Sequence, residues 1–447
     1  MRKDAAAAIE HDLWFNPHLG PNFATDDSRA RSHAVISVPL LAVKEHDRKR
    51  RLRSKAVNAF FRVMIPVLSN LTVHYLRGSP GNGVPVPLSN QQLGKKGDRY
   101  DPLSFPRSFP QMLNALRTLG FAEVTLGKYS GFPGQSKRTT MRAGPKMVAL
   151  IEEHKVTLED FSGHYDEEVI VLSRRRRGYW DEGQRIDYQD NATTRRYRQE
   201  LRAINEWLGQ ADITFDAASF DKPVNVQVRQ LRRKFTLGRF DRGGRLFGGF
   251  WINLPKAARL QGIRIEGEEV AALDYSALNP VLAYHVVEAE PPPGDLYTLP
   301  GFEQSRDGVK RVFNAMLFKH PVVQFPKGAR TLFPRKAKCG EVTDAILARH
   351  PMLKGVLSSE ETGHQLQFLE SEITMGVLRK CQQLNIVALP IFDCVVVKAS
   401  AEKTVTEIMK EGFKLATGLD IKVTRESPQR LEEGSRSFRS CGQLSKP

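Results

Sequence analysis

The sequence predicts an α+β protein, because segments typical of buried strands and of amphipathic helices both occur in it. Two short apolar runs, at 269–276 and 386–397, have the composition of buried strands. Each run carries one aspartate, Asp274 or Asp393, where the strand is expected to end. Helical spacing is found at 51–76 and 193–208, where apolar or basic side chains recur at intervals of three and four residues.

The two aspartates are candidate ligands of divalent cations. A carboxylate beside a buried strand loses hydration, and a bound cation offsets that cost. Two such carboxylates that converge would hold a pair of Mg²⁺ ions for in-line attack on a phosphorus atom. The alternative interpretation is that each aspartate only forms a turn, for which aspartate is a preferred residue.

The segment 306–318 lies between the two aspartates and is expected to be a helix. Its polar and aromatic side chains at every fourth position would then share one face. These residues are Arg306, Lys310, Asn314 and Phe318. Two cations, an amide and an aromatic ring in a row suit a nucleoside triphosphate. The alternative is an ordinary basic helix face.

A segment rich in glycine and arginine, 238–255, precedes the first aspartate. Glycine lets the backbone approach another molecule closely, and arginine offers a fork of donors for phosphate oxygens. Phe247, Phe250 and Trp251 make this segment too apolar for a flexible linker.

Taken together and in this order, these segments resemble the family A DNA polymerases and the related single-subunit RNA polymerases of bacteriophages and mitochondria. Asp274-Tyr275-Ser276 is similar to the opening of motif A, and Phe392-Asp393-Cys394 stands at the place of motif C. The resemblance implies that Asp274 and Asp393 are catalytic and hold two Mg²⁺ ions. It covers roughly 238–422, which is under half of the chain.

The resemblance also implies nucleotide and nucleic-acid contacts. Arg306, Lys310 and Phe318 match the frame of motif B, whose cations hold the incoming triphosphate. The nucleotide-binding residues it implies are Arg306, Lys310, Asn314, Phe318, Tyr275 and Asn279. The residues implied to contact template and primer are Asp241, Gly244, Arg245, His364 and Gln367. Glu370 and Glu372 are expected on a solvated helix face rather than as accessory carboxylates.

Several positions depart from the family pattern and leave the substrate open. Phe392 replaces the histidine of motif C, Asn279 replaces a glutamate that meets the sugar in DNA polymerases, and Phe318 replaces a tyrosine. The expected function is that of a DNA polymerase that extends a primer on a template. A primase or RNA polymerase on the same palm is one alternative, and a DNA-binding or replication-initiator protein with a degenerate palm is another. The sequence does not decide between deoxynucleotides and ribonucleotides.

The composition favours a polyanionic partner and excludes several other classes. The 447 residues carry a formal net charge of +17, which suits nucleic acid. The four cysteines lie far apart, which argues against a zinc ribbon and a disulfide framework and fits a cytoplasmic protein. We find no P-loop typical of helicases, no apolar run long enough to span a membrane and no signal-peptide core.

The N-terminal half predicts a DNA-binding module. A helix at 51–76 is followed by a short helix at 87–94, a second at 109–119 and two strands, 121–126 and 138–143, around a basic loop. This order resembles a winged-helix domain, in which one helix enters the major groove and the wing contacts the backbone. Arg138 and Arg142 would then contact nucleic acid. The alternative is a small domain that packs against the rest of the chain or binds protein.

The expected fold is therefore a right-hand polymerase palm with abbreviated fingers, preceded by a winged-helix-like domain and a helical, thumb-like segment. The expected boundaries are a loosely packed basic arm at 1–50, the winged-helix-like domain at 51–160, the thumb-like region at 161–237, the palm and fingers at 238–426, and a disordered tail at 427–447.

Overall fold

The computed structural model of the chain describes most of its residues. The described ranges are 16, 19–22, 25–46, 54–78, 83–86, 88, 93–94, 98–100, 105–127, 139–163, 167–175, 183–220, 224–359 and 361–426. The expected short helix at 87–94, the basic loop of the hairpin, Arg138 and the tail at 427–447 lie wholly or mostly outside these ranges.

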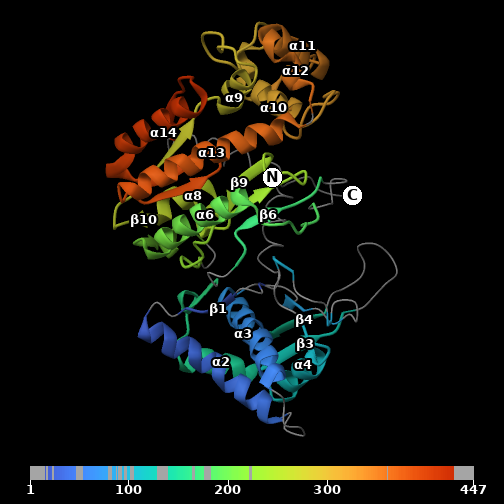
Figure 1. Cartoon of the computed structure of the whole chain (residues 1–447), viewed down its shortest axis with the longest axis vertical. Coiled ribbons are helices and arrows are strands. Elements are labelled where there is room, and N and C mark those ends of the chain that lie inside the picture. The colour runs from blue at the N-terminus through green and yellow to red at the C-terminus, as the bar shows by residue number, and fades with distance from the viewer. Residues whose placement is uncertain are drawn as a thin grey trace, which may run out of the picture. The chain divides into compact units, whose positions relative to one another are not determined.

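The chain folds into two compact units, and both helices and strands are present, so the predicted α+β class is confirmed. Unit 1 contains 1–168 and 215–230, and unit 2 contains 169–214 and 231–447. Figure 1 shows the elements of both units. The region 161–237, expected to form one connecting segment, is thus divided between the units.

Helices form most of the core of unit 1. They are α2 (Asp26–His46), α3 (Ser54–Leu76), α4 (Phe109–Thr118) and α5 (Pro145–Glu153). The prediction of a loosely packed arm is wrong for residues 26–46, because α2 buries Val35, Ile36 and Leu40 against the other helices. The buried face of α2 was not recognised in the sequence because two of its buried side chains, Ser28 and Ser32, are polar.

Two small antiparallel sheets complete unit 1. Strand β1 (Leu19–Pro21) pairs with β5 (Phe161–Gly163). Strands β2 (Val84–Pro85), β4 (Thr140–Ala143) and β3 (Ala122–Thr125) form the second sheet in that order. The hairpin predicted from residues 121–143 is therefore present, with α4 directly before it.

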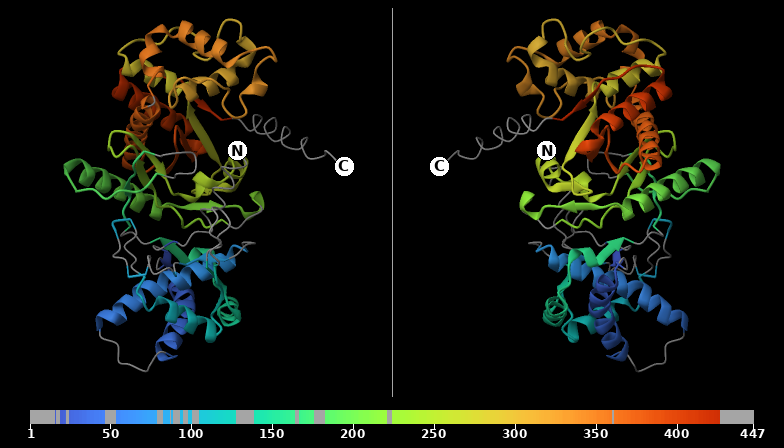
Figure 2. Two further views of the ribbon diagram at one scale, coloured as in Figure 1. Left: turned by 90° about the vertical axis from the view of Figure 1, so that its right-hand side faces the viewer. Right: turned by 90° about the vertical axis from the view of Figure 1, so that its left-hand side faces the viewer.

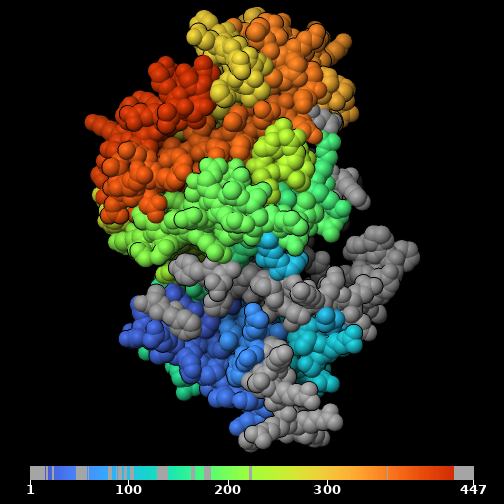
Figure 3. Space-filling model, viewed as in Figure 1, coloured from blue at the N-terminus to red at the C-terminus, as the bar shows by residue number. Residues whose placement is uncertain are grey.

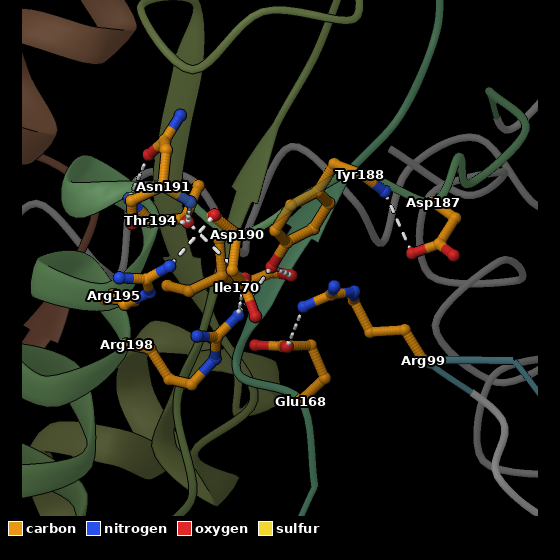
Figure 4. A network of polar contacts seen from close by, with 10 residues as sticks. All are labelled: Arg99, Glu168, Ile170, Asp187, Tyr188, Asp190, Asn191, Thr194, Arg195 and Arg198. Atoms are coloured by element: carbon orange, nitrogen blue, oxygen red, sulfur yellow. Dashed lines mark hydrogen bonds and ion pairs between the residues drawn. The ribbon is translucent and has the colours of Figure 1, made fainter.

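In unit 2, a three-stranded sheet carries the glycine-rich segment. Its order is β6 (Ile170–Leu172), β8 (Arg232–Phe235) and β9 (Gly243–Phe247), with β6 parallel to β8 and β9 antiparallel to it. Helix α6 (Ala192–Gln210) begins at a cap in which the Asn191 side chain accepts a hydrogen bond from the Thr194 backbone N–H. Arg198 contacts Asp190 at 2.7 Å and the Tyr188 hydroxyl at 3.3 Å, and that hydroxyl donates to the carbonyl of Ile170 (Figure 4). These bonds attach the start of α6 to β6.

A four-stranded antiparallel sheet lies at the centre of unit 2. Its order is β12 (Ala388–Ile391), β13 (Cys394–Lys398), β11 (Val270–Tyr275) and β14 (Val423–Arg425). Helices α13 (Thr362–Gln383) and α14 (Glu402–Thr417) pack against each other and against its strands. Helices α6 and α13 contact each other and lie side by side on the face shown in Figure 3.

A group of helices lies beyond one end of the four-stranded sheet. It contains α9 (Leu278–Val286), α10 (Arg306–Met316), α11 (Cys339–Arg349) and α12 (Lys354–Leu357). Both views in Figure 2 show these helices together at one end of unit 2. The remaining elements are α7 (Phe250–Asn253), α8 (Lys256–Gly262) and the pair β7 (Ile213–Phe215) and β10 (Ile263–Ile265). Within the described ranges, every helix is too short or too polar to cross a membrane.

Candidate active site

The strand β11 places Asp274 at the end of a buried sheet. Residues 270–273 are all apolar and buried, and Asp274 follows them one residue before the strand ends. Its Oδ1 atom is buried and has no hydrogen-bond partner among the described residues. Burial and the neighbouring charges of Asp393 and Glu426 raise the pKa of Asp274 to about 7, and the charges of Lys310 and Lys256 oppose the shift.

The hairpin of β12 and β13 places Asp393 beside Asp274. Phe392 and Asp393 form its two-residue turn, and Cys394 stands opposite Asp274 in the register of β13 and β11. The Asp393 carbonyl accepts a hydrogen bond from the Tyr275 backbone N–H at 3.5 Å. Phe392 has φ of 59°, a conformation in which a side chain is strained by about 1–2 kcal/mol. The two predicted aspartates are therefore brought together.

The chemistry of this carboxylate pair fits a divalent cation. A buried carboxylate oxygen without a partner, next to a second carboxylate, is costly unless a cation neutralises it. Among the described residues, no group of three or more His, Cys, Asp or Glu side chains is arranged to hold a metal. Two carboxylates are still sufficient for Mg²⁺, which usually keeps several waters and takes its remaining ligands from substrate phosphates.

Helix α10 brings Lys310 near this pair. Val309, Val312 and Phe313 are buried, as expected for the inner face, and Lys310 is close enough to Asp274 to lower its pKa. The helix ends at Met316, so Phe318 lies just beyond it rather than on its fourth turn. The predicted helix is confirmed, and Lys310 of its polar face acts on Asp274.

Arg306, the first residue of α10, is held by an acidic neighbour. Its Nε donates to Asp295 Oδ2 at 2.8 Å, and its Nη2 lies 2.7 Å from the same oxygen. Its guanidinium also lies over the ring of Tyr297, 5.5 Å from the centroid. Burial opposes ionisation of Asp295, but the hydrogen bond and charge of Arg306, together with hydrogen bonds from the backbone, outweigh it and lower the pKa of that carboxyl. Arg306 and Asp295 are both partly exposed, so another anion can compete for the arginine.

A side-chain hydrogen bond joins Asn279 of α9 to Asn314 of α10. The Asn279 Nδ2 donates to Asn314 Oδ1 at 2.9 Å, and both residues are half-buried. Asn279 stands five residues after Asp274, so the amide pair lies near the end of β11. The structure thus brings together two residues that sequence analysis assigned separately to nucleotide binding.

Phe318, His364 and Gln367 form a second small cluster. The rings of Phe318 and His364 meet edge to face with centroids 5.2 Å apart, and His364 Nδ1 lies 3.4 Å from Gln367 Oε1. A Cβ at position 363 would lie 2.4 Å from the Phe318 ring, so a larger residue there would displace the ring. The cluster joins the end of α10 to the start of α13.

Tyr275 requires a correction to its expected role. Neighbouring residues of a strand face opposite sides, and Tyr275 points away from Asp274 into the core. It is buried, its hydroxyl donates to the Met409 carbonyl of α14 at 2.9 Å, and its ring contacts Phe413. The side chain supports β11 from behind and does not reach a nucleotide beside Asp274.

Arg245 is held by Glu370, which corrects the prediction that Glu370 lies on a solvated face. Glu370 is 2% exposed and accepts two hydrogen bonds from Arg245, at 2.8 and 2.5 Å. Burial raises the pKa of Glu370 to about 7, although the charge of Arg245 opposes the shift. The guanidinium also lies over the ring of Phe392, 5.1 Å from its centroid. Arg245 therefore supports the turn that carries Asp393.

The glycines and Arg233 pack β9 against α13. Gly244 has φ of +81°, and a Cβ there would lie 2.7 Å from Ser371 Oγ. The buried Arg233 donates to the Gly244 carbonyl, to Ser371 Oγ at 2.7 Å and to Glu372 at 2.5 Å. Glu372 is thus an ion-pair partner rather than a merely solvated residue. Asp241, in the preceding loop, pairs with Arg239 at 2.8 and 2.6 Å and with Arg242 at 3.1 Å.

Sequence analysis missed Glu426 and Lys256. Glu426 follows β14, whose strand pairs with β11 at Asp274, and it contacts Lys256 at 2.6 Å. Both charges act on the pKa of Asp274. The alternation of apolar and polar residues at 421–425 predicts a strand, but its pairing partner is set by the fold. In unit 1, Arg142 is exposed on β4, and Arg138 lies outside the described residues.

Comparisons with known proteins give little further information. No family model matches the chain, and no curated protein matches it. Among solved structures, the chain is similar to the POL domain of Pol1 from M. smegmatis in complex with DNA primer-template and dNTP, at 10% identity and a TM-score of 0.30. The match covers 52% of this chain and 51% of that chain. A likeness this slight establishes neither a shared fold nor a shared function.

Proposed function

We propose that this protein is a template-directed nucleic-acid polymerase that adds nucleotides to a 3′-hydroxyl. In this proposal the sheet of β11–β14, with α13 and α14, is the palm, and α9–α12 are abbreviated fingers. Helix α6 takes the thumb-like position, and unit 1 is a winged-helix-like DNA-binding module. DNA is the favoured product.

The single observation that carries the proposal is the juxtaposition of Asp274 and Asp393 with Lys310. One oxygen of Asp274 is buried without a partner, the other aspartate raises its pKa, and Lys310 acts on it from α10. A scaffold gains no stability from such an arrangement, since unsatisfied buried carboxylates destabilise a fold. A site for phosphates and cations accounts for it.

The chain's own residues would act by placing charge. Lys310 and Arg306 would neutralise the triphosphate, with Arg306 exchanging Asp295 for a phosphate oxygen. The Asn279 and Asn314 amides would meet the sugar, and Phe318, His364 and Gln367 would contact the terminal base pair. Arg245 and Glu370 would hold the Phe392–Asp393 turn in position. When bound by Asp274 and Asp393, two Mg²⁺ ions supply activation of the primer hydroxyl and stabilisation of the leaving pyrophosphate.

A second candidate is a primase or RNA polymerase. The polar pair of Asn279 and Asn314 favours it, because an amide can hydrogen-bond a 2′-hydroxyl. The non-catalytic alternative is supported by Phe392, whose apolar ring stands where a polar contact to the primer end is expected.

Extension of a labelled primer on a template, with deoxynucleotides and ribonucleotides supplied separately in Mg²⁺, tests the proposal. We expect extension by the wild-type protein and none by Asp393→Asn. Asp420→Asn is the matched control, because it removes an equally charged but exposed carboxylate from the same unit. Extension only with ribonucleotides, or only without a primer, would favour the second candidate. No synthesis under any of these conditions would overturn the proposal.

For unit 1 we propose DNA binding through α4 and the β3–β4 hairpin. Arg142 is exposed on β4. Binding of duplex DNA by the full chain should weaken for Arg142→Gln, whereas Arg29→Gln on the exposed face of α2 should leave it unchanged. Equal binding by both variants would contradict this role.

A further inference from the structure

A third carboxylate, that of Glu426, lies on the same face of the four-stranded sheet as Asp274. Strand β14 pairs with β11 so that Thr424 stands opposite Asp274, and the Glu426 backbone N–H donates to the Ala272 carbonyl at 2.9 Å. The pairing therefore continues to Glu426, which stands opposite Ala272. Side chains directly opposite each other, and side chains two residues apart, point to the same side of a sheet. Glu426 and Asp274 consequently share one face.

The neighbouring residues of both strands face the other side of the sheet. Arg425 contacts Glu402 of α14 at 2.8 Å, and the Tyr275 hydroxyl donates to a backbone carbonyl of the same helix. The sheet thus separates a face covered by α14 from a face that carries Asp274 and Glu426.

Lys256, the first residue of α8, holds Glu426 in an ion pair. Its Nζ lies 2.6 Å from Glu426 Oε1, and the side chains of the lysine and the glutamate are 35% and 22% exposed. Besides burial and Asp393, the charge of Glu426 raises the pKa of Asp274, and the charge of Lys256 lowers it by a smaller amount. The ion pair therefore adds net negative potential at Asp274.

We propose that Glu426 is a positioning residue of the cation site, which strengthens the binding of a divalent cation by Asp274 and Asp393, and that Lys256 restrains it. This inference rests on the proposed function. The described residues hold no group of three acidic, histidine or cysteine side chains in the geometry of metal ligands. Glu426 therefore acts through its charge and through the waters that Mg²⁺ keeps in its coordination shell, as the outer partners of metal sites do.

The alternative is that Glu426 and Lys256 only tie the end of β14 to α8. The two roles predict effects of different sign. Removing either partner of a purely structural pair has the same effect on the fold and on every property that depends on it. A pair that sets the potential at a cation site responds in opposite directions, because Glu426 attracts the cation and Lys256 repels it.

The test is binding of Mn²⁺ by the full-length protein, without nucleotide or nucleic acid, measured from the electron paramagnetic resonance signal of the free ion. Mn²⁺ takes the same kinds of oxygen ligand as Mg²⁺. We expect Glu426→Gln to weaken binding about 10-fold and Lys256→Gln to strengthen it about 2- to 5-fold. Asp393→Asn measures the binding that does not belong to the aspartate pair.

Glu402→Gln is the matched control and should leave Mn²⁺ binding unchanged. It also removes a carboxylate that is ion-paired at β14, but from the face that α14 covers. Circular dichroism checks the fold of each variant. If Glu426→Gln fails to fold, the sign of the Lys256→Gln effect still decides the inference.

Weaker binding by both Glu426→Gln and Lys256→Gln, or a Glu426→Gln effect no larger than that of Glu402→Gln, would overturn the inference. Equal binding by the wild-type protein and Asp393→Asn would also overturn it, because the aspartates would then hold no cation. The expected changes in Mn²⁺ binding, together with an absence of primer extension, would support this inference and overturn only the proposed polymerase activity.

Discussion

Asp160 in unit 1 is a buried carboxylate and Asp274 in unit 2 has one buried carboxylate oxygen, but their surroundings are opposite. Asp160 accepts hydrogen bonds from Ser28 at 2.8 Å, from Arg31 at 2.8 and 3.0 Å and from the Thr157 backbone N–H at 2.8 Å. Asp274 has a buried oxygen with no described partner and a second carboxylate nearby.

The difference is the one expected between a carboxylate that supports the fold and one that binds a ligand, the role proposed for Asp274. Burial opposes ionisation in both cases, but Arg31 and the other donors outweigh it and lower the pKa of Asp160, whereas Asp393 adds to it and raises the pKa of Asp274 to about 7. A carboxylate that supports the fold is saturated with donors. A carboxylate that binds a ligand keeps acceptor oxygens without protein donors, which lowers the stability of the fold.

The largest effect is expected from Asp274→Asn. Primer extension should fall by roughly 10³-fold or more, equivalent to about 4 kcal/mol of transition-state stabilisation. The free energy of unfolding should not fall, because the Oδ1 atom of Asp274 has no hydrogen bond to lose. Extension rates and denaturant unfolding of the same preparation measure both. A loss of unfolding free energy as large as that expected for Asp160→Asn would contradict the difference drawn between Asp274 and Asp160.

The reverse result is expected from Asp160→Asn. This change should lower the free energy of unfolding of unit 1 by about 2–4 kcal/mol, because it removes the charged partner of Arg31 and turns an amide N–H toward other donors. Denaturant unfolding followed by circular dichroism measures it. Asp26→Asn, on the exposed side of α2, is the control and should change little.

The two carboxylates should also respond to pH in opposite directions. The pKa of Asp160 is lowered, so its contribution to stability is complete above the unfolded value of about 3.9 and is lost as pH falls through the folded value. The pKa of Asp274 is raised, so without metal its ionisation reduces stability as pH rises from about 4 to about 7. Unfolding free energies in a chelating buffer, compared with those of Asp160→Asn and Asp274→Asn, separate the two slopes. Parallel curves for wild type and variants would contradict this assignment.

The smallest effect is expected from Asp295→Asn. Loss of this carboxylate releases Arg306 for the triphosphate, so KM for the nucleotide should fall about 2- to 5-fold with little change in kcat. Steady-state extension kinetics measure both constants. A raised KM would mean that Asp295 positions Arg306 for the substrate instead of competing with it.

Local patterns in the sequence predicted much of the fold near the site. The strand ends at Asp274 and Asp393, the helix from Arg306 and the hairpin of β3 and β4 are all present, because apolar runs and helical spacing are properties of consecutive residues. Strand alternation also implies that Tyr275 faces away from Asp274. The resemblance to motif A led instead to the prediction that Tyr275 binds nucleotide.

The remainder depends on contacts between distant segments. Glu370 looks like a solvated helix residue in sequence, and only the packing of β9 on α13 buries it against Arg245. Asp295 and Glu426 likewise have partners, Arg306 and Lys256, that no spacing rule predicts. Helix α2 was missed because its buried face includes serines that bond within unit 1.

In the proposed polymerase, the hydrogen bond between Asn279 and Asn314 would link recognition of the nucleotide sugar to the position of α10. It joins α9, at the end of the strand carrying Asp274, to α10, which carries Lys310. A sugar hydroxyl that takes over either amide breaks this connection and frees α10 to move relative to the sheet. By reciprocity, a displacement of α10 that breaks the bond increases affinity for that hydroxyl by the same factor. Under the proposed function, two asparagines would therefore make nucleotide selection and the movement of α10 a single equilibrium.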